Sequence, residues 1–229
     1  MSLSPKRIDV SRPLQILYTN CDQLLNKFDE LLTIVGDEKP DTILLTEVIP
    51  KAQTLPIAVP RISIPGFHLF TNFDPDLSDL GKSGCRGIVV YVAECLQPLQ
   101  VSYQSSFRKN LCLNIFLDNN ENLLVGNIYC SPSFDKSIST NKLCDLISYV
   151  CNTKPCYLLV VGDFNYPNID WINGCLTGVD HNEQLFYDTL QDCVLFQLVT
   201  QPTRVRPDTD PHILDLILTN EETMHGSKY

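Results

Sequence analysis

The stretch LLVVGDFNYPNID (residues 158–170) joins a buried strand to a small group of polar side chains. Its four apolar residues predict a strand covered on both faces, and Gly162 separates that run from Asp163. Side chains alternate along an extended chain, so Asp163 and Asn165 are expected on one side and Phe164 on the other, packed inward. The pattern predicts a sheet protein that presents a carboxylate and an amide together at a strand end.

The rest of the chain alternates between strand-like and helix-like segments. A polar turn at 117–122 predicts a hairpin, and Gly36 and Pro40 are expected to end the first helix. Mixed elements of this kind predict an α/β or α+β sheet protein with a sizeable core. Strands are expected over 14–20, 41–47, 87–94, 111–117, 122–130 and 212–220, and helices over 21–35, 140–151 and 182–195.

Length and composition indicate one globular domain. The chain has 229 residues, 44% of them hydrophobic, with no change of composition or Gly/Ser linker, so residues 14–229 are interpreted as one domain after a lead-in of 1–13. The opening MSLSPKRIDV lacks the apolar core of a secretory signal, and no apolar run approaches the roughly 18–20 residues of a membrane span. We therefore expect an intracellular protein, nuclear or cytoplasmic, without a membrane partner.

Charge and cysteine usage exclude simpler classes of function. The net charge of -10 argues against a module that coats nucleic acid by charge alone, although a nuclease that holds a cation on carboxylates is compatible with it. None of the 10 cysteines is spaced C-x-x-C, which gives no support to a zinc ribbon or a thioredoxin-like site. Residues such as Cys112, Cys144 and Cys193 are interpreted as small buried hydrophobes in a reducing compartment.

Polar residues recur at the ends of the predicted strands, where ligand sites of sheet proteins gather. Each has a structural alternative: Asn20 or Asp22 as a helix cap, Glu47 as a solvated strand end, Tyr129 as a core aromatic, and Asp163 as a turn residue. A carboxylate inside an apolar strand costs several kcal/mol unless it is paired. A purely structural role is therefore hardest to accept for Asp215, which lies within the apolar segment ILDLIL. The ordered set is Asn20, Glu47, Tyr129, Asp163, Asn165 and Asp215.

This ordered set resembles the endonuclease/exonuclease/phosphatase superfamily. The segments that carry the resemblance are YTN, LLTE, IYCSPS, VGDFN and ILDLILTN, in that order. Four longer segments are similar to the endonuclease domain of non-LTR (LINE-type) retrotransposons: NKFDEL, KPDTILLTE, GDFNYPNIDW and LVTQPTRV. The similarity spans residues 14–220. It implies a four-layered α/β sandwich, with two packed mixed sheets flanked by helices.

The resemblance also implies hydrolysis of a phosphodiester with Mg²⁺ or Mn²⁺. Glu47, with Asp22 as a second candidate, would hold the metal through hard oxygen ligands. Asp163 would deprotonate the attacking water and Asn165 would position the same reacting group. Asn20 and Tyr129 would donate to phosphate oxygens, and Asp215 would orient a histidine.

Thr203 and Arg204 of QPTR are candidate contacts to DNA phosphates or grooves, although an exposed arginine is by default simply solvated. The partner implied is double-stranded DNA, with a reverse transcriptase domain expected in a full-length polyprotein.

The sequence departs from the family pattern at three places. The family completes its site with a Ser-Asp-His segment on a final strand, whereas only 14 residues follow Asp215, and neither His212 nor His225 has that context. The last strand is therefore expected to be missing, as in a fragment or a degenerate copy, and the chain is expected to be weakly active or inactive. The strand entry GKSGCRGIVVYV carries Arg86 where a small residue is usual, and IYCSPS lacks the basic residue that usually follows the tyrosine.

Three hypotheses follow from these residues. The first is a retrotransposon endonuclease that nicks target DNA to prime reverse transcription. The second is another superfamily phosphodiesterase or phosphatase, acting on abasic DNA, RNA tails or phospholipid headgroups. The third is a non-catalytic, domesticated interaction module.

Overall fold

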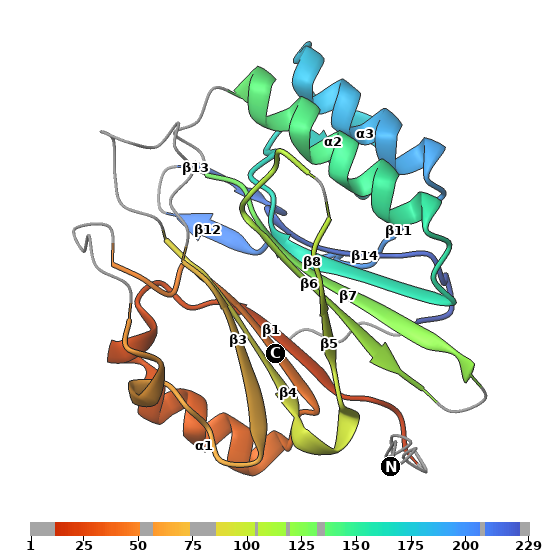
Figure 1. Cartoon of the computed structure of the whole chain (residues 1–229). Coiled ribbons are helices and arrows are strands. Elements are labelled where there is room, and N and C mark those ends of the chain that lie inside the picture. The colour runs from red at the N-terminus through yellow and green to blue at the C-terminus, as the bar shows by residue number, and fades with distance from the viewer. Residues whose placement is uncertain are drawn as a thin grey trace.

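The structure of the chain is a computed structural model that describes residues 12–50, 57–73, 86–103, 105–117, 120–131, 136–206 and 209–224. Two sheets pack face to face and helices cover both outer faces (Figure 1). This is the four-layered α/β sandwich that the resemblance implied. Within the described residues, no helix is long and apolar enough to cross a membrane.

The first sheet has four strands in the order β1-β2-β4-β3, with β1 and β2 parallel and the other pairs antiparallel. Helix α1 (Phe28–Glu38) covers its outer face (Figure 1). The strands are β1 (Ile16–Asn20), β2 (Thr42–Thr46), β3 (Phe67–Asn72) and β4 (Ile88–Ala93).

The second sheet has six strands in the order β11-β14-β8-β7-β6-β5, with β7 and β8 parallel. Helices α2 (Lys136–Asn152) and α3 (His181–Asp192) lie together on its outer face (Figure 1). The strands are β5 (Leu99–Val101), β6 (Asn110–Phe116), β7 (Asn122–Tyr129), β8 (Tyr157–Asp163), β11 (Phe196–Gln197) and β14 (Asp215–Thr219).

Two short ribbons and three 3-10 turns complete the described elements. The ribbons pair β9 (Ile169–Asp170) with β10 (Cys175–Leu176), and β12 (Arg204–Arg206) with β13 (Thr209–His212). The turns are η1 (Leu24–Asn26), η2 (Val59–Arg61) and η4 (Glu94–Leu96).

Strand β8 shows why its sequence is a continuous apolar run. Leu159 and Val161 pack between the two sheets, whereas Leu158 and Val160 pack against the helices of the outer layer. A strand buried on both faces needs apolar residues at every position, which is the pattern of central strands. The predicted inward packing of Phe164 is confirmed, since its side chain is buried and lies 5.5 Å from the ring of Phe186 on α3.

A buried amide links the two sheets. Asn127 of β7 is fully buried and faces the first sheet, where its Nδ2 donates to the backbone carbonyls of Leu45 on β2 (3.1 Å) and Val89 on β4 (3.4 Å). Leu45 and Val89 are themselves opposite each other in register. This side chain therefore fixes the second sheet against the first sheet. It does so at a position two residues before Tyr129.

Two details of the sequence interpretation are wrong. Gly36 does not end the first helix, because α1 continues to Glu38 and stops at Lys39, which takes a left-handed conformation (φ 50°) and donates its N–H to Val35. The last strand does not run from 212 to 220, because β14 begins at Asp215, which is therefore strand-borne as expected, and His212 belongs to the separate strand β13. His225 lies outside the described residues. Cys112 and Cys144 are buried as expected, and Cys193 is partly buried.

Gly162 is required by the close approach of β7 to β8. A Cβ atom at this position would lie 1.9 Å from the carbonyl oxygen of Ile128, its partner in register. We predict that Gly162→Ala lowers the free energy of unfolding by about 2–4 kcal/mol, because backbone must move to relieve the clash. Chemical denaturation measures this loss.

Gly178→Ala is the matched control, since no atom lies within 4 Å of its added Cβ and the residue is exposed. This variant should stay within about 0.5 kcal/mol of the wild type. Equal stability of the two variants would contradict the packing described for Gly162.

Candidate active site

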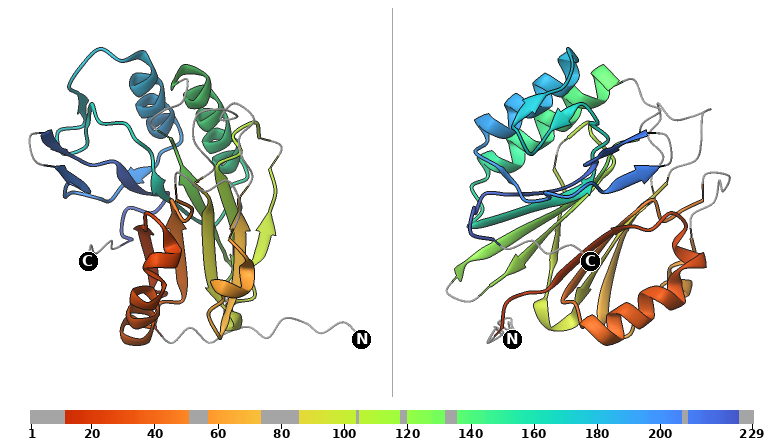
Figure 2. Two further views of the ribbon diagram at one scale, coloured as in Figure 1. Left: turned by 90° about the vertical axis from the view of Figure 1, so that its left-hand side faces the viewer. Right: turned by 180° about the vertical axis from the view of Figure 1, so that it is seen from behind.

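Register brings the predicted polar residues to one end of the sandwich. In the second sheet, Tyr129 of β7 stands opposite Asp163 of β8, which stands opposite Asp215 of β14. In the first sheet, Asn20 at the end of β1 stands opposite the last residue of β2, and Glu47 follows directly. Both strand ends point to the side that carries the β12–β13 ribbon (Figure 2).

Three side-chain hydrogen bonds cross from one sheet to the other at this end. The amide Nδ2 of Asn20 donates to Asp163 Oδ2 (3.1 Å), and the hydroxyl of Tyr129 donates to Glu47 Oε1 (2.8 Å). The hydroxyl of Tyr18 donates to Asp215 Oδ1 (2.7 Å). Five of the six residues predicted from strand ends are therefore brought together, with Tyr18 as an addition.

Asp163 lies in an electrostatic environment that favours its protonated form. Burial raises its pKa to about 8, with further contributions from the negative charges of Asp215 and Glu47. The hydrogen bond from Asn165 and the positive charge of Arg204 act in the opposite direction. A carboxylate with such a pKa is a stronger base, once ionised, than an exposed aspartate.

Asn165 reaches Asp163 through a turn. It has a left-handed backbone conformation (φ 55°), and its Nδ2 contacts Asp163 Oδ1 (2.5 Å) and the carbonyl oxygen of Cys130 (2.7 Å). The expected convergence of the two residues is confirmed, but strand alternation is not its cause, since β8 ends at Asp163. The pairing holds Asp163 from the loop side.

Glu47 is also held in a left-handed conformation (φ 54°), which is uncommon for a residue other than glycine, asparagine or aspartate. Such a conformation costs on the order of 1 kcal/mol or more and persists where surrounding contacts impose it. Tyr129 supplies one such contact, and its buried hydroxyl has a raised pKa, first from burial and then from the charge of Glu47. Tyr129 is thus a neutral donor to the carboxylate.

Asp22 and Glu47 share a cation from the protein itself. Nη2 of Arg86 contacts Asp22 Oδ1 and lies 2.7 Å from Glu47 Oε2, and Nη1 donates to the carbonyl oxygen of Ile49 (2.8 Å). The Arg86 side chain is only 5% exposed. Arg86 stood out in the sequence only as a departure from a small residue, and its pairing was not predicted.

The alternative readings of Asn20 and Asp22 as helix caps are wrong. Helix α1 and the turn η1 have no side-chain cap, and the loop after β1 instead runs along the end of β2 through backbone hydrogen bonds. Those bonds join the N–H of Gln23 to the carbonyl of Glu47 and the N–H of Leu24 to that of Val48. The loop therefore carries Asp22 alongside Glu47.

Tyr18 is a site residue that the sequence analysis missed. Its hydroxyl lies 3.2 Å from Thr46 Oγ1 besides donating to Asp215, and its pKa is raised well above the usual value by burial and then by the charges of Asp215 and Asp163. It precedes Asn20 by two residues, so strand alternation places both on one face. That spacing is the signal that could have identified it.

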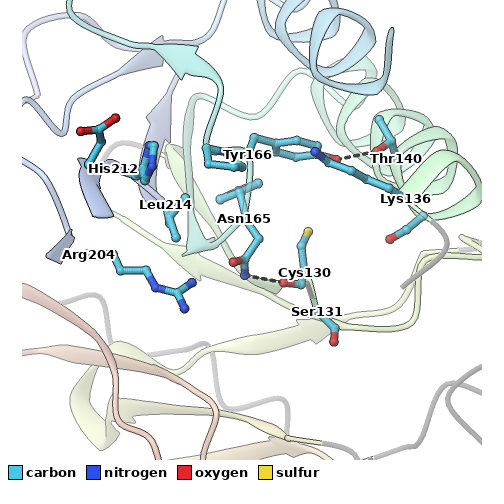
Figure 3. Close-up of a pocket in the computed structure, with 13 residues that line it drawn as sticks. Cys130, Ser131, Lys136, Thr140, Asn165, Tyr166, Arg204, His212 and Leu214 are labelled. Carbon is cyan, nitrogen blue, oxygen red and sulfur yellow. Dashed lines mark hydrogen bonds between the residues drawn. The ribbon is translucent and has the colours of Figure 1, made fainter. Parts of the chain in front are cut away.

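Thr203 and Arg204 lie at the edge of this cluster. The hydroxyl oxygen of Thr203 accepts from the backbone N–H groups of Leu214 and Asp215, at 3.0 Å each, and so fixes the start of β14. Arg204 and Asn165 line one pocket of about 350 Å³ (Figure 3). The pocket is bordered by Cys130, Ser131, Lys136, Tyr166 and His212 among others.

The donor set at Glu47 and Asp22 fits a hard divalent cation. Within the described residues, no three His, Cys, Asp or Glu side chains gather as a metal cage. Mg²⁺ seldom uses such a cage and is commonly held by one or two carboxylates together with substrate phosphate and water. Glu47 and Asp22 provide two carboxylates that already converge on one positive group, Arg86 Nη2.

Comparison with known proteins gives the same fold. Residues 123–228 match the family model described as endonuclease-reverse transcriptase. No curated protein sequence matches the chain.

The solved structures that are similar include the endonuclease domain of TRAS1, a telomere-specific non-LTR retrotransposon (17% identity, TM-score 0.65, covering 92% of this chain and 86% of that one). An AP endonuclease from Archaeoglobus fulgidus is similar at 13% identity and a TM-score of 0.61, covering 91% and 87%. The exonuclease NExo from Neisseria meningitidis is similar at 17% identity and 0.62, covering 90% and 86%.

The raised pKa of Asp163 predicts how stability depends on pH in the absence of metal. Between its ordinary pKa near 3.8 and the folded value of about 8, the unfolded chain releases the proton that the folded chain retains. The free energy of unfolding of the wild type should therefore fall, relative to that of Asp163→Asn, by about 1.4 kcal/mol per pH unit across this window. The difference should level off above pH 8, and a difference that stays constant from pH 4 to 8 would contradict the prediction.

Tyr18→Phe should remove the phenol that pairs with Asp215. We expect a loss of about 1–3 kcal/mol in the free energy of unfolding, and a much smaller loss when Asp215→Asn is already present, because the two groups act as a pair. Tyr187→Phe, which removes an exposed hydrogen bond to the carbonyl of Gly174, is the control and should cost less than about 1 kcal/mol. Additive losses in the double variant would argue against the pairing.

Proposed function

We propose that this protein is a metal-dependent DNA endonuclease. The chain has the endonuclease/exonuclease/phosphatase fold, and its residues 123–228 match an endonuclease-reverse transcriptase family. The observation that supports the proposal is the cross-sheet cluster, in which Asp163 with Asn20 and Asn165 on its oxygens lies at the same end of the sandwich as the Glu47 and Asp22 carboxylates. The arrangement suits hydrolysis of a phosphodiester.

Glu47 and Asp22 would hold Mg²⁺ or Mn²⁺. The bound ion would supply charge compensation at the phosphoryl and leaving oxygens. The fit of these residues rests on their convergence and on the oxygen chemistry of the two carboxylates.

Asp163 accepts the proton of the attacking water. The water oxygen forms a bond to phosphorus while the bond from phosphorus to O3′ breaks, and the leaving O3′ takes up a proton from solvent water to become a hydroxyl. A free 3′ hydroxyl is the product that could prime reverse transcription. Asn20 and Asn165 hold the two Asp163 oxygens and so aim the base, and Asn20 Nδ2 has a second N–H that could donate to a phosphate oxygen. The Tyr129 hydroxyl donates to Glu47 in this structure, so it would have to leave that carboxylate to donate to phosphate.

The substrate we propose is double-stranded DNA at the retrotransposon target, with a reverse transcriptase domain in the same polyprotein. Although the net charge is -10, cations are placed locally around the site. Arg204 lines the pocket beside Asn165, and Lys109 Nζ lies 5.8 Å from the ring centroid of Tyr129. Arg204 is the candidate phosphate contact. Thr203 is a second candidate, because its hydroxyl oxygen accepts two backbone hydrogen bonds and its proton remains able to donate to phosphate.

Tyr18 suggests that turnover is slow. The resemblance implies a histidine on Asp215, whereas here a buried phenol donates to that carboxylate. A phenol whose pKa is raised well above the usual value stays neutral, so it lacks the positive charge that a histidine could place beside the phosphate.

The test is nicking of supercoiled plasmid DNA by the purified chain with Mg²⁺ or Mn²⁺. We expect slow nicking that requires metal and falls by about a hundredfold or more in Asp163→Ala, because general-base catalysis contributes at least that much. Asp188→Asn, a change at an exposed carboxylate on α3, is the control and should leave the rate unchanged.

Substrate comparison separates the proposed function from its alternatives. Faster release of phosphate from phosphoinositides, or cleavage confined to abasic DNA, would move the protein to another branch of phosphodiester chemistry. Metal binding without turnover on any of these substrates would favour a non-catalytic interaction module.

A further inference from the structure

Arg86 is a buried cation placed between two exposed or partly exposed carboxylates. Its guanidinium lies inside the protein, whereas the side chain of Asp22 is 60% exposed and that of Glu47 is 16% exposed. The contacts run through one nitrogen, Nη2, which bridges both carboxylates from the interior side. The Asp22 carboxylate is therefore the more solvent-exposed member of the pair, while Glu47 Oε1 also accepts from the Tyr129 hydroxyl (2.8 Å).

The bridging arginine is strongly charged and firmly held. Its Nη2 contacts Asp22 Oδ1 and lies 2.7 Å from Glu47 Oε2, so the buried guanidinium is paired with two carboxylates. Nη1 is fixed by the Ile49 carbonyl, and the N–H of Ile49 returns a bond to the carbonyl of Arg86 (2.8 Å). The Arg86 side chain cannot move into solvent without breaking its bond to the Ile49 carbonyl and its contacts with the two carboxylates.

An arginine has five N–H donors, and the one on Nε is not used here. Nε of Arg86 is buried and has no hydrogen-bond partner within the described residues. An unsatisfied buried donor costs on the order of 1–3 kcal/mol, so a position chosen for stability alone would not favour this geometry. The position is better explained by what the guanidinium does to the two carboxylates.

We propose that Arg86 is a built-in cation that holds Asp22 and Glu47 in the absence of metal and weakens the binding of divalent metal to them. This inference rests on the proposed function, in which those two carboxylates hold the metal. A metal ion that approaches from solvent meets a positive charge already bonded to its ligands, and the two cations repel at short range. Arg86 is thus a positioning residue that sets the metal affinity of the site.

The experiment is titration of the intact chain with Mn²⁺, followed by electron paramagnetic resonance of the free ion and by calorimetry. Arg86→Met removes the charge and keeps the length of the side chain. We expect its dissociation constant for Mn²⁺ to fall by about tenfold or more relative to the wild type. We also expect its melting temperature to rise with Mn²⁺ concentration far more steeply than that of the wild type.

Arg86→Lys and Arg12→Met are the matched controls. The lysine variant keeps a positive charge beside the carboxylates and should retain the weak affinity of the wild type. Arg12 forms a bidentate pair with Asp41 through Nη1 (2.9 Å) and Nη2 (2.8 Å), so Arg12→Met removes an arginine–carboxylate pair elsewhere and should leave the metal affinity unchanged. Arg86→Gln, which keeps a donor for the Ile49 carbonyl, replaces Arg86→Met if that variant does not fold.

The outcomes separate this inference from the proposed function. Affinity in the uncharged Arg86 variants that equals or falls below that of the wild type would overturn the inference, and metal-dependent nicking by the wild type would still stand. Tighter binding in those variants, together with a wild type that cleaves no phosphodiester, would support the role of Arg86 and reject the nuclease.

Discussion

The concentration of negative charge at one end of the sandwich is the constraint on which the site depends. Asp22, Glu47, Asp163 and Asp215 meet where the two sheets end, and each carboxylate carries a specific partner. Arg86 compensates two of them, while neutral donors from the opposite sheet hold the others. Burial raises the pKa of Asp163 to about 8, so this side chain stays protonated at lower pH. Its neutral form reduces the repulsion among the carboxylates further.

The fold makes this convergence possible because both sheets are fixed in register and against each other. Parallel pairing of β7 with β8 and antiparallel pairing of β8 with β14 align Tyr129, Asp163 and Asp215 in one row. Gly162 allows the backbones of the first pair to approach, and Asn127 ties the row to the first sheet. A hydrophobic sandwich thus acts as a rigid mount for polar groups that would otherwise repel.

Much of this arrangement could be predicted from the sequence. The LLVV run predicted a strand buried on both faces, and the order of polar strand ends, through its resemblance to a known superfamily, implied the sandwich and named six residues of the cluster. These inferences succeed because strand periodicity and each short motif can be recognised within a few consecutive residues.

The partners could not be predicted, because they depend on contacts distant in sequence. Tyr18 and Asp215 are 197 residues apart, and Arg86 and Asp22 are 64 apart. The backbone conformation that directs Asn165 toward Asp163 was not predicted from strand alternation. A residue in the left-handed conformation changes the direction of the chain, and the pattern of polar and apolar residues does not reveal it. Gly36 misled for a related reason, because a glycine that is tolerated inside a helix looks the same in sequence as one that ends it.

The most direct test of the account is an anomalous-scattering map from crystals grown with Mn²⁺. We expect a metal peak about 2.1 Å from a Glu47 oxygen, on the solvent side of the Asp22–Glu47 pair, with Asp163 nearby and not bound to the ion. A map with Arg86 alone between the two carboxylates at saturating Mn²⁺, and metal bound elsewhere or nowhere, would contradict it.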